Sequence, residues 1–145
     1  MEIQPKNMTE DEKALCRQAI KEYKEIRPVV QLGNIYRLQS PFDKKGVASL
    51  MYVDDAKQNA VFYWWKTETF IYQHLPLIKM AGLDANKMYN VHELNRIDNK
   101  PLDCEGKSYS GEYLMSHGLE MPYNHSVDRD KQTAWSSRVL ELSVE

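Results

Sequence analysis

The chain has 145 residues, of which 42% are hydrophobic and 28% charged, and its net charge at pH 7 is −2. This length and composition suit one domain, or one domain plus an added element, with a well-hydrated surface. Acidic and basic residues are interspersed without a basic run, which disfavours nucleic acid and anionic membranes as partners. No apolar stretch approaches the length of about 18 residues that spans a membrane, and residues 1–8 lack a signal-peptide core. The sequence therefore predicts a soluble chain and leaves its compartment open.

An amphipathic helix is predicted at the start of the chain. The run from Thr9 to Glu12 has the spacing of a capping box, in which each of these two residues binds the backbone of the other. Apolar residues then recur at helical spacing: Leu15, Cys16, Ala19, Ile20, Tyr23 and Ile26. Pro28 lacks an N–H and disfavours the α conformation at Arg27, so we expect the helix to end near Ile26. The apolar stripe predicts a packing partner, which the rest of the chain need not contain.

After Gly33 the pattern changes to short β-rich runs separated by turns. Strands are expected at 34–38, 47–53, 60–66, within 75–83, 88–94, 107–109, 119–123 and 137–144. One or two helical turns are expected at 110–118, with Ser110 as N-cap and Gly118 as C-cap. The runs 47–53 and 60–65 are apolar on both faces, which is typical of central strands that are also covered from outside.

This arrangement predicts a mainly β fold, because no long helices separate the strands. We expect an antiparallel β-sandwich of the Greek-key type with about seven or eight strands, preceded by one N-terminal α-helix. The chain then divides into an N-terminal helix and linker at 1–30 and a β-sandwich domain at 31–145.

The aromatic run at 62–65 is the first candidate for a binding role, because aromatic rings stack on the apolar faces of sugars. Adjacent strand residues point to opposite faces, so Trp64 and Trp65 cannot form one flat platform. One of them should enter the core, while the other should face solvent or a neighbouring domain. We favour this structural interpretation and keep Trp64, Trp65 and Trp135 as weak candidates for sugar contact.

Catalytic chemistry is not indicated by the remaining polar residues. The histidines His74, His92, His117 and His125 have no spacing that fixes a metal, and His92 and Glu93 should face opposite sides of a strand. Glycosidases need two carboxylates across the scissile bond. The neighbouring acids are Asp54 with Asp55, Asp103 with Glu105, and Asp128 with Asp130. All lie in turn-like stretches, where we expect them to stay solvated and ionised. The sequence predicts no catalytic, metal-binding or cofactor-binding residue and no cofactor.

The two cysteines are predicted to be unreactive. Cys16 lies on the apolar stripe of the helix, where a buried position is expected. Cys104 follows Asp103 and precedes Glu105, whose negative charges would raise the pKa of a thiol. Two cysteines do not predict a disulfide framework, and the sequence leaves undecided whether they form one disulfide bond.

Six segments, taken in order and spacing, resemble the C-terminal domain of α-galactosidases of glycoside hydrolase family 36. They are residues 23–38, Ser40 with Pro41, 48–65, 77–95, 106–122 and 137–145. Leu32, Asn34 and Leu94 look like conservative variants of the family's sequence pattern, and the doubled Trp64-Trp65 departs from that pattern.

The resemblance implies a parent enzyme with an N-terminal β-supersandwich, a (β/α)₈ barrel and a C-terminal antiparallel β-sandwich. Its chemistry would be retaining and would use two aspartates of the barrel, whose motifs have no counterpart here. The helix at 9–26 would be the last barrel helix, with its stripe facing the barrel. In this chain alone, that stripe must pack on the sandwich, bind another copy or stay exposed.

We therefore expect a non-catalytic accessory domain whose partners are the absent catalytic barrel or, through the N-terminal helix, a second copy of the chain. By itself it should hydrolyse nothing. The first alternative is a carbohydrate-binding module that uses surface aromatics. A second alternative is a small enzyme that uses histidines and carboxylates from converging loops, and a third is a gene that encodes only this segment.

Overall fold

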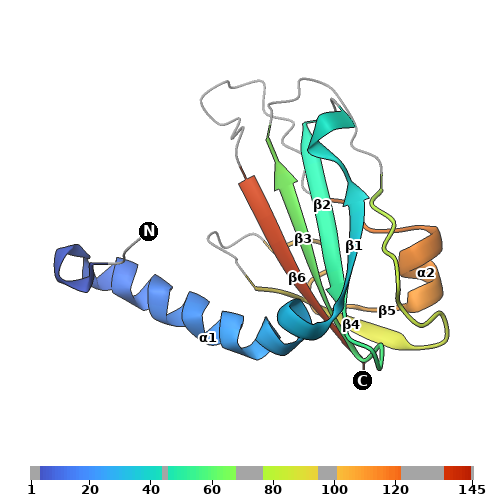
Figure 1. The fold of residues 1–145 in the computed structure, drawn as a ribbon, viewed down its shortest axis with the longest axis horizontal. Helices are drawn as coiled ribbons and strands as arrows, with labels where there is room; N and C mark the ends of the chain where they lie inside the picture. The colour runs from blue at the N-terminus through green and yellow to red at the C-terminus, as the bar shows by residue number, and fades with distance from the viewer. Residues whose placement is uncertain (1–3, 44–45, 68–76, 95–100, 122–135, 145) are drawn as a thin grey trace.

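One antiparallel sheet organises the chain in the computed structural model, which describes residues 4–43, 46–67, 77–94, 101–121 and 136–144 (Figure 1). In spatial order its strands are β1 (Asn34–Gln39), β2 (Val47–Val53), β3 (Asn59–Lys66), β6 (Ser136–Val144), β4 (Met88–Glu93) and β5 (Ser108–Ser110). The other elements are α1 (Glu10–Leu32), α2 (Gly111–Ser116) and the 3₁₀ turns η1 (Pro5–Asn7) and η2 (Pro41–Asp43). The predicted mainly β antiparallel fold after one N-terminal helix is confirmed. The second sheet of a sandwich, the number of strands and the division at residue 30 stay predictions.

Most strands lie where the sequence predicted them. β2 has the predicted bounds, and β1, β3, β4, β5 and β6 agree with prediction to within one residue at each end. The strand predicted within 75–83 is wrong for the described residues 77–83, where a single antiparallel bridge joins Ile78 to Leu119. The cause is that the backbone donors of this segment go to different partners. The Ile78 N–H binds the Leu119 carbonyl, whereas the Met80 N–H binds the Leu114 carbonyl. The strand predicted at 119–123 is likewise reduced to this bridge in its described part.

Helix α1 begins as predicted but ends later. Its capping box is formed, with Glu12 N–H donating to Thr9 Oγ1 over 3.2 Å and Thr9 N–H donating to Glu12 Oε2 over 2.8 Å. The predicted end near Ile26 is wrong, because the helix continues through Pro28 to Leu32. Proline inside a helix costs about 3 kcal/mol. The last turns bury Ile26 and Val29 against the sheet, and each buried aliphatic side chain gains about 1.5–3 kcal/mol. Tertiary packing therefore offsets the local preference.

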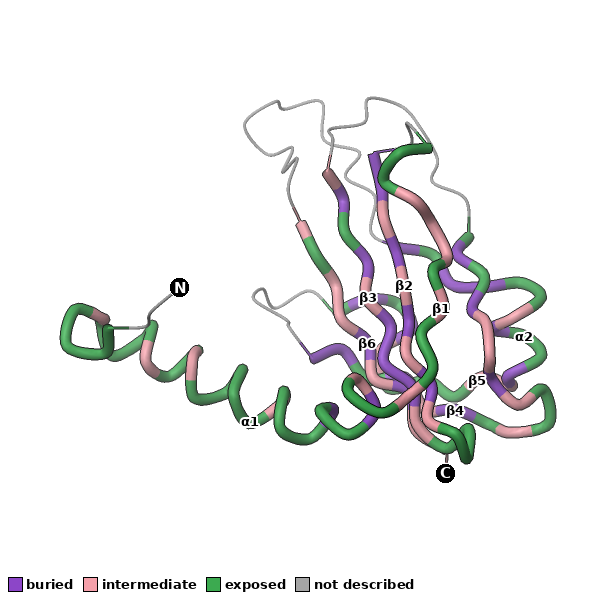
Figure 2. The backbone as a smooth tube through the Cα atoms, viewed as in Figure 1, coloured by how far each residue is buried: buried purple, intermediate pink, exposed green. Residues whose placement is uncertain are grey.

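The two faces of the sheet are covered differently. The strands direct these side chains to one face, the core face: Val47, Met51, Val53, Ala60, Phe62, Trp64, Tyr89, Val91, Leu140 and Leu142. Segments 77–83, 101–106 and 119–121 and helix α2 pack over it, and buried residues concentrate there (Figure 2). Among the described segments, the last turns of α1 cover the opposite face, the helix face. There Ile26 and Val29 join Val61 and Leu94 in a second buried cluster. Among the described residues, neither α1 nor α2 combines the length and apolar character needed to cross a bilayer.

Helix α2 follows the predicted capping pattern with one shift. Ser110 is its N-cap, and the Ser110 Oγ accepts from the Tyr113 N–H over 3.1 Å. The C-cap is His117 rather than Gly118. Gly118 comes next with a φ of 90°, a left-handed conformation that favours glycine, and its N–H binds the Tyr113 carbonyl. This glycine turns the chain from α2 back to the bridge with Ile78.

Cys104 lies in the core under the sheet and is 5% exposed. Burial is the largest influence on its thiol and, with the nearby Glu93 and Glu105 carboxylates, raises its pKa to about 11. The predicted direction is confirmed, but its main cause is burial rather than the neighbouring acids. Cys16 is half-buried rather than buried as expected, because the part of α1 that carries it meets no strand. Both cysteines are free, so the bridge left open by the sequence is not formed.

Gly118 and Gly106 provide a test of close backbone packing. A Cβ at Gly118 would lie 2.4 Å from the Ile78 carbonyl oxygen, whereas a Cβ at Gly106, with a φ of 68°, would meet nothing within 4 Å. We expect Gly106→Ala to lower the free energy of unfolding by about 1–2 kcal/mol through left-handed strain alone. Gly118→Ala should cost at least twice as much in urea denaturation, and equal losses would contradict the packing described here.

The thiols provide a test of burial. At pH 8 a pKa near 11 leaves Cys104 with about a hundredfold less thiolate than an unshifted thiol. We expect a thiol-specific disulfide reagent to label Cys16 first and Cys104 slowly, and Cys104 labelling to accelerate as the pH rises toward 11. Peptide mass spectrometry over time measures both rates. Rapid labelling of folded Cys104 at pH 8 would show that the thiol is not buried.

Candidate interaction surface

The doubled tryptophan divides between the two faces as predicted. Trp64 is 0% exposed and packs in the core, whereas Trp65 is 37% exposed on the helix face. Trp135 lies outside the described residues. Trp65 is therefore the one of the pair that a ligand or a partner can reach, and its role in sugar contact stays a prediction.

The carboxylates near turns have structural contacts. Asp54 accepts hydrogen bonds from the backbone N–H groups of Gln58, over 2.8 Å, and Asn59, over 3.1 Å, and so closes the β2–β3 turn. Asp55 accepts from Asn34 Nδ2 over 2.9 Å. Asp128 and Asp130 lie outside the described residues. Asp54 therefore stabilises the β2–β3 turn, and Asp55 ties this turn to the start of β1.

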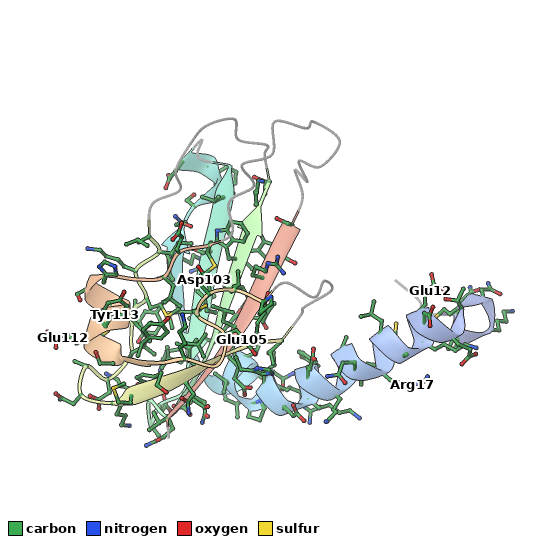
Figure 3. All side chains as sticks on the ribbon, turned by 180° about the vertical axis from the view of Figure 1, so that it is seen from behind. Glu12, Arg17, Asp103, Glu105, Glu112 and Tyr113 are labelled. Atoms are coloured by element: carbon green, nitrogen blue, oxygen red, sulfur yellow. The ribbon has the colours of Figure 1, made fainter. Side chains whose placement is uncertain are left out.

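Glu105 corrects the expectation of a fully solvated acid, since its side chain is only 20% exposed. It accepts from the Glu93 backbone N–H and lies 2.9 Å from His92 Nδ1. Figure 3 shows it beside the sheet, with Asp103 close by in the same segment. The Glu105 carboxylate thus binds two groups of β4, the Glu93 N–H and the His92 ring, and holds segment 101–106 against that strand.

A buried ion pair was missed by the sequence reasoning. The Glu93 side chain is fully buried, lies 3.0 Å from Arg138 Nη1 and accepts from the Leu102 N–H over 3.2 Å. His92 is exposed on the opposite face, as predicted. The two partners are 45 residues apart in the chain, so no local pattern joins them. A signal did exist, since Arg138 shares the core face with Leu140 and Leu142, where an arginine requires a partner.

No catalytic or metal centre arises from these groups in the part of the chain that the structure describes. The described histidines, cysteines and acids include no group of three or more that could hold a metal ion. His74 and His125 lie outside that part. The buried Glu93 carboxylate binds Arg138 and a backbone N–H, so the pair holds β4, β6 and segment 101–106 together.

The clearest candidate for function is an exposed apolar surface on α1. Its N-terminal part leaves the sheet and extends away from it (Figure 1), and the residues there are mainly exposed (Figure 2). Leu15 is 55% exposed, Ile20 49% and Tyr23 46%. We call these three residues, together with half-buried Cys16, the helix stripe. At about 100° per residue, Leu15 lies on the side of the helix that buries Ile26, and Tyr23, Cys16 and Ile20 follow at increasing angles round the same stripe. The stripe is therefore covered beside Ile26 and bare toward its N-terminal end.

A second apolar surface lies on the helix face beside the contact with α1. It consists of Ala48, Leu50, Tyr63 and Trp65, which the register of β2 and β3 places side by side, and we call it the sheet patch. The rings of Tyr63 and Trp65 are stacked, with centroids 5.7 Å apart and planes 8° apart. Burial, followed by the nearby Tyr52 and Tyr23 hydroxyls, raises the pKa of Tyr63. Tyr63 also packs against the buried cluster that contains Ile26, so the sheet patch borders the place where α1 meets the sheet.

The sequence was compared with known families and proteins. Residues 47–142 match the model of the glycosyl hydrolase family 36 C-terminal domain. The probable alpha-galactosidase C of Aspergillus terreus is 32% identical over 127 residues, which are 88% of this chain and 15% of that protein. Alpha-galactosidase AgaA of Geobacillus stearothermophilus is 30% identical over 125 residues, 86% of this chain and 15% of that protein.

Solved structures give the same result. The crystal structure of the GH36 alpha-galactosidase AgaA superposes with a TM-score of 0.80 at 26% identity, covering 99% of this chain and 17% of that one. AgaB, also from Geobacillus stearothermophilus, superposes with a TM-score of 0.77 at 26% identity, covering 97% and 17%. The chain spans about a sixth of the length of these relatives. It belongs to the family of glycosyl hydrolase family 36 C-terminal domains.

Proposed function

We propose that this chain is the non-catalytic C-terminal domain of an α-galactosidase-like glycoside hydrolase, and that it packs on and stabilises a (β/α)₈ barrel that precedes it. The helix stripe is the observation that carries the proposal. Leu15, Ile20 and Tyr23 are exposed along an apolar stripe of α1, of which Leu15 lies on the side that buries Ile26 and Ile20 at the opposite margin. Soluble proteins rarely leave such a continuous apolar surface uncovered, so a stripe of this kind marks an interaction site.

The family assignment indicates what covers the stripe. The matched family is a C-terminal domain, and the chain corresponds to about a sixth of each relative, so most of a relative precedes the matched part. A domain at that position would meet α1 first. Burial of each large stripe residue would contribute about 1.5–3 kcal/mol to its docking. In this proposal α1 is the last helix of the barrel and the sheet holds its C-terminal end in place.

The carboxylates of the described residues have structural contacts, which supports an accessory role. A retaining or inverting glycosidase needs one carboxylate as acid and a second one across the sugar. Here Glu93 is paired with Arg138, Asp54 closes a turn, and Glu105 binds the edge of β4. The acids that hydrolyse the substrate would then belong to the barrel, and the sugar would be a galactoside, as in the names of the relatives.

A second copy of the chain is the partner that we propose for α1 when the barrel is missing. The first turn of α1 is acidic, with Glu10, Asp11 and Glu12, whereas residues 21–27 mix three basic side chains with Glu22 and Glu25. Antiparallel pairing of two copies would join the helix stripes and oppose the two helix dipoles, which favours this alignment.

A carbohydrate-binding module is the alternative that one observation favours, namely the exposure of Trp65 beside two hollows of the surface. Titration with galactose or raffinose, followed by tryptophan fluorescence, separates the two functions. A saturable change that disappears in Trp65→Ser would support sugar binding. An unchanged spectrum up to millimolar sugar supports the accessory role.

The helix stripe is tested by Ile20→Ser, with Lys21→Ser as the matched control on the opposite side of α1. In the chain extended upstream through its own reading frame, we expect Ile20→Ser to lower the melting temperature by several degrees, while Lys21→Ser leaves it unchanged. A frame that encodes no barrel would overturn the proposal.

The isolated chain gives a further test of the same stripe. We expect it to dimerise, and Ile20→Ser to weaken the dimer by roughly tenfold or more in sedimentation, since each dimer buries the residue twice. It should not hydrolyse a nitrophenyl α-galactoside. Turnover that vanishes when a carboxylate is replaced would identify an enzyme instead of an accessory domain.

A further inference from the structure

The sheet patch (Ala48, Leu50, Tyr63 and Trp65) lies where α1 leaves the helix face, with Trp65 exposed and its three neighbours half-buried. We propose that this patch is a second docking site for the domain that precedes α1, with Trp65 as its anchor. The inference rests on the proposed function and goes beyond it, because it assigns part of the interface to the sheet and not only to the helix. It predicts that the preceding domain contacts both α1 and strands β2 and β3.

The shape of the surface around Trp65 suits a protein partner. Trp65 borders two hollows, one of about 520 Å³ that also includes Leu50, Pro41 and Phe42, and one of about 380 Å³ that includes Thr67 and Ser137. Trp65 therefore lies between two depressions into which side chains of a partner can fit. Phe42, in η2, is 89% exposed at the border of the larger hollow. Exposed aromatic side chains next to pockets are typical anchors of protein interfaces.

The position of α1 indicates which partner this is. The last turns of α1 pack on the helix face beside Tyr63. Trp65 shares that face with Tyr63, so the chain reaches the sheet from the face that carries Trp65. The relatives are about six times longer, and the matched part is their C-terminal domain. The sheet patch continues a contact that already exists within the chain, which favours the preceding domain as its occupant.

The local chemistry is less suited to a sugar. One face of the Trp65 ring lies parallel to Tyr63, so a sugar could reach only the other face. Two polar groups of the larger hollow are engaged within the chain: Gln39 Oε1 accepts from Ser49 Oγ over 3.1 Å, and Ser40 Oγ accepts from the Phe42 N–H over 3.2 Å. Arg37 and Asp43 also line this hollow, so polar groups stand at its edge and apolar ones beside the aromatic ring. The apolar border of Ala48, Leu50 and Trp65 is better matched by apolar side chains.

The proposal is tested by oxidative footprinting of unmutated protein. Hydroxyl radicals are applied to the isolated chain, diluted until it is monomeric, and to the chain extended upstream through its reading frame. We expect the oxidation of Trp65 to fall at least fivefold in the longer protein. Tyr113 is the matched control, because it is 41% exposed against 37% for Trp65 and lies on α2, which packs on the other face of the sheet (Figure 3). Its oxidation should not change, and Trp64 should be protected in both proteins.

Substitution of Trp65 measures how much the proposed contact contributes to stability. Trp65→Ser should lower the melting temperature of the longer protein more than that of the isolated chain, which loses only the contacts of Trp65 within the chain, such as its stacking on Tyr63, and Tyr113→Ser should change both equally. If Ile20→Ser destabilises the longer protein while Trp65 stays fully reactive, the sheet patch is not a docking site and the proposed function stands. If Trp65 is protected only after raffinose is added, the patch binds sugar and this inference is wrong. A reading frame without a barrel overturns both proposals.

Discussion

The contact between the last turns of α1 and the helix face of the sheet is the interaction on which the rest of the structure depends. Ile26 and Val29 are buried there with Val61 and Leu94, and this burial carries the helix through Pro28. The contact fixes where α1 leaves the sheet, and thereby which residues of the helix and of the strands stay bare. The helix stripe and the sheet patch adjoin because both border this one cluster. A single packing interaction thus defines the surface that a preceding domain would meet.

The sequence predicted well whatever depends on neighbouring residues. The Thr9 capping box, the Ser110 N-cap and the strand bounds of β2 follow from local spacing, and all were found. The opposite directions of Trp64 and Trp65 follow from strand geometry alone. The family resemblance was also readable, because it rests on several short segments in a fixed order.

Predictions failed where distant segments decide the outcome. Pro28 ends a helix locally, yet the sheet supplies enough burial to continue it. Residues 77–83 read as a strand, yet the Ile78 N–H binds Leu119, which follows α2, and the Met80 N–H binds Leu114, which lies within α2. The ion pair of Glu93 with Arg138 joins residues that no sequence window contains together. The candidate surface was predictable in its helical half from the apolar stripe, whereas the sheet patch required the register of β2 and β3.

Strand β6 is the last element of the chain, yet it lies in the interior of the sheet, between β3 and β4. The hairpin of β2 and β3 and the pair of β4 and β5 are therefore synthesised before the strand that joins them. During translation the two halves keep unpaired edges until β6 has left the ribosome exit tunnel. Loss of residues 136–144 would therefore split the sheet in two rather than shorten it.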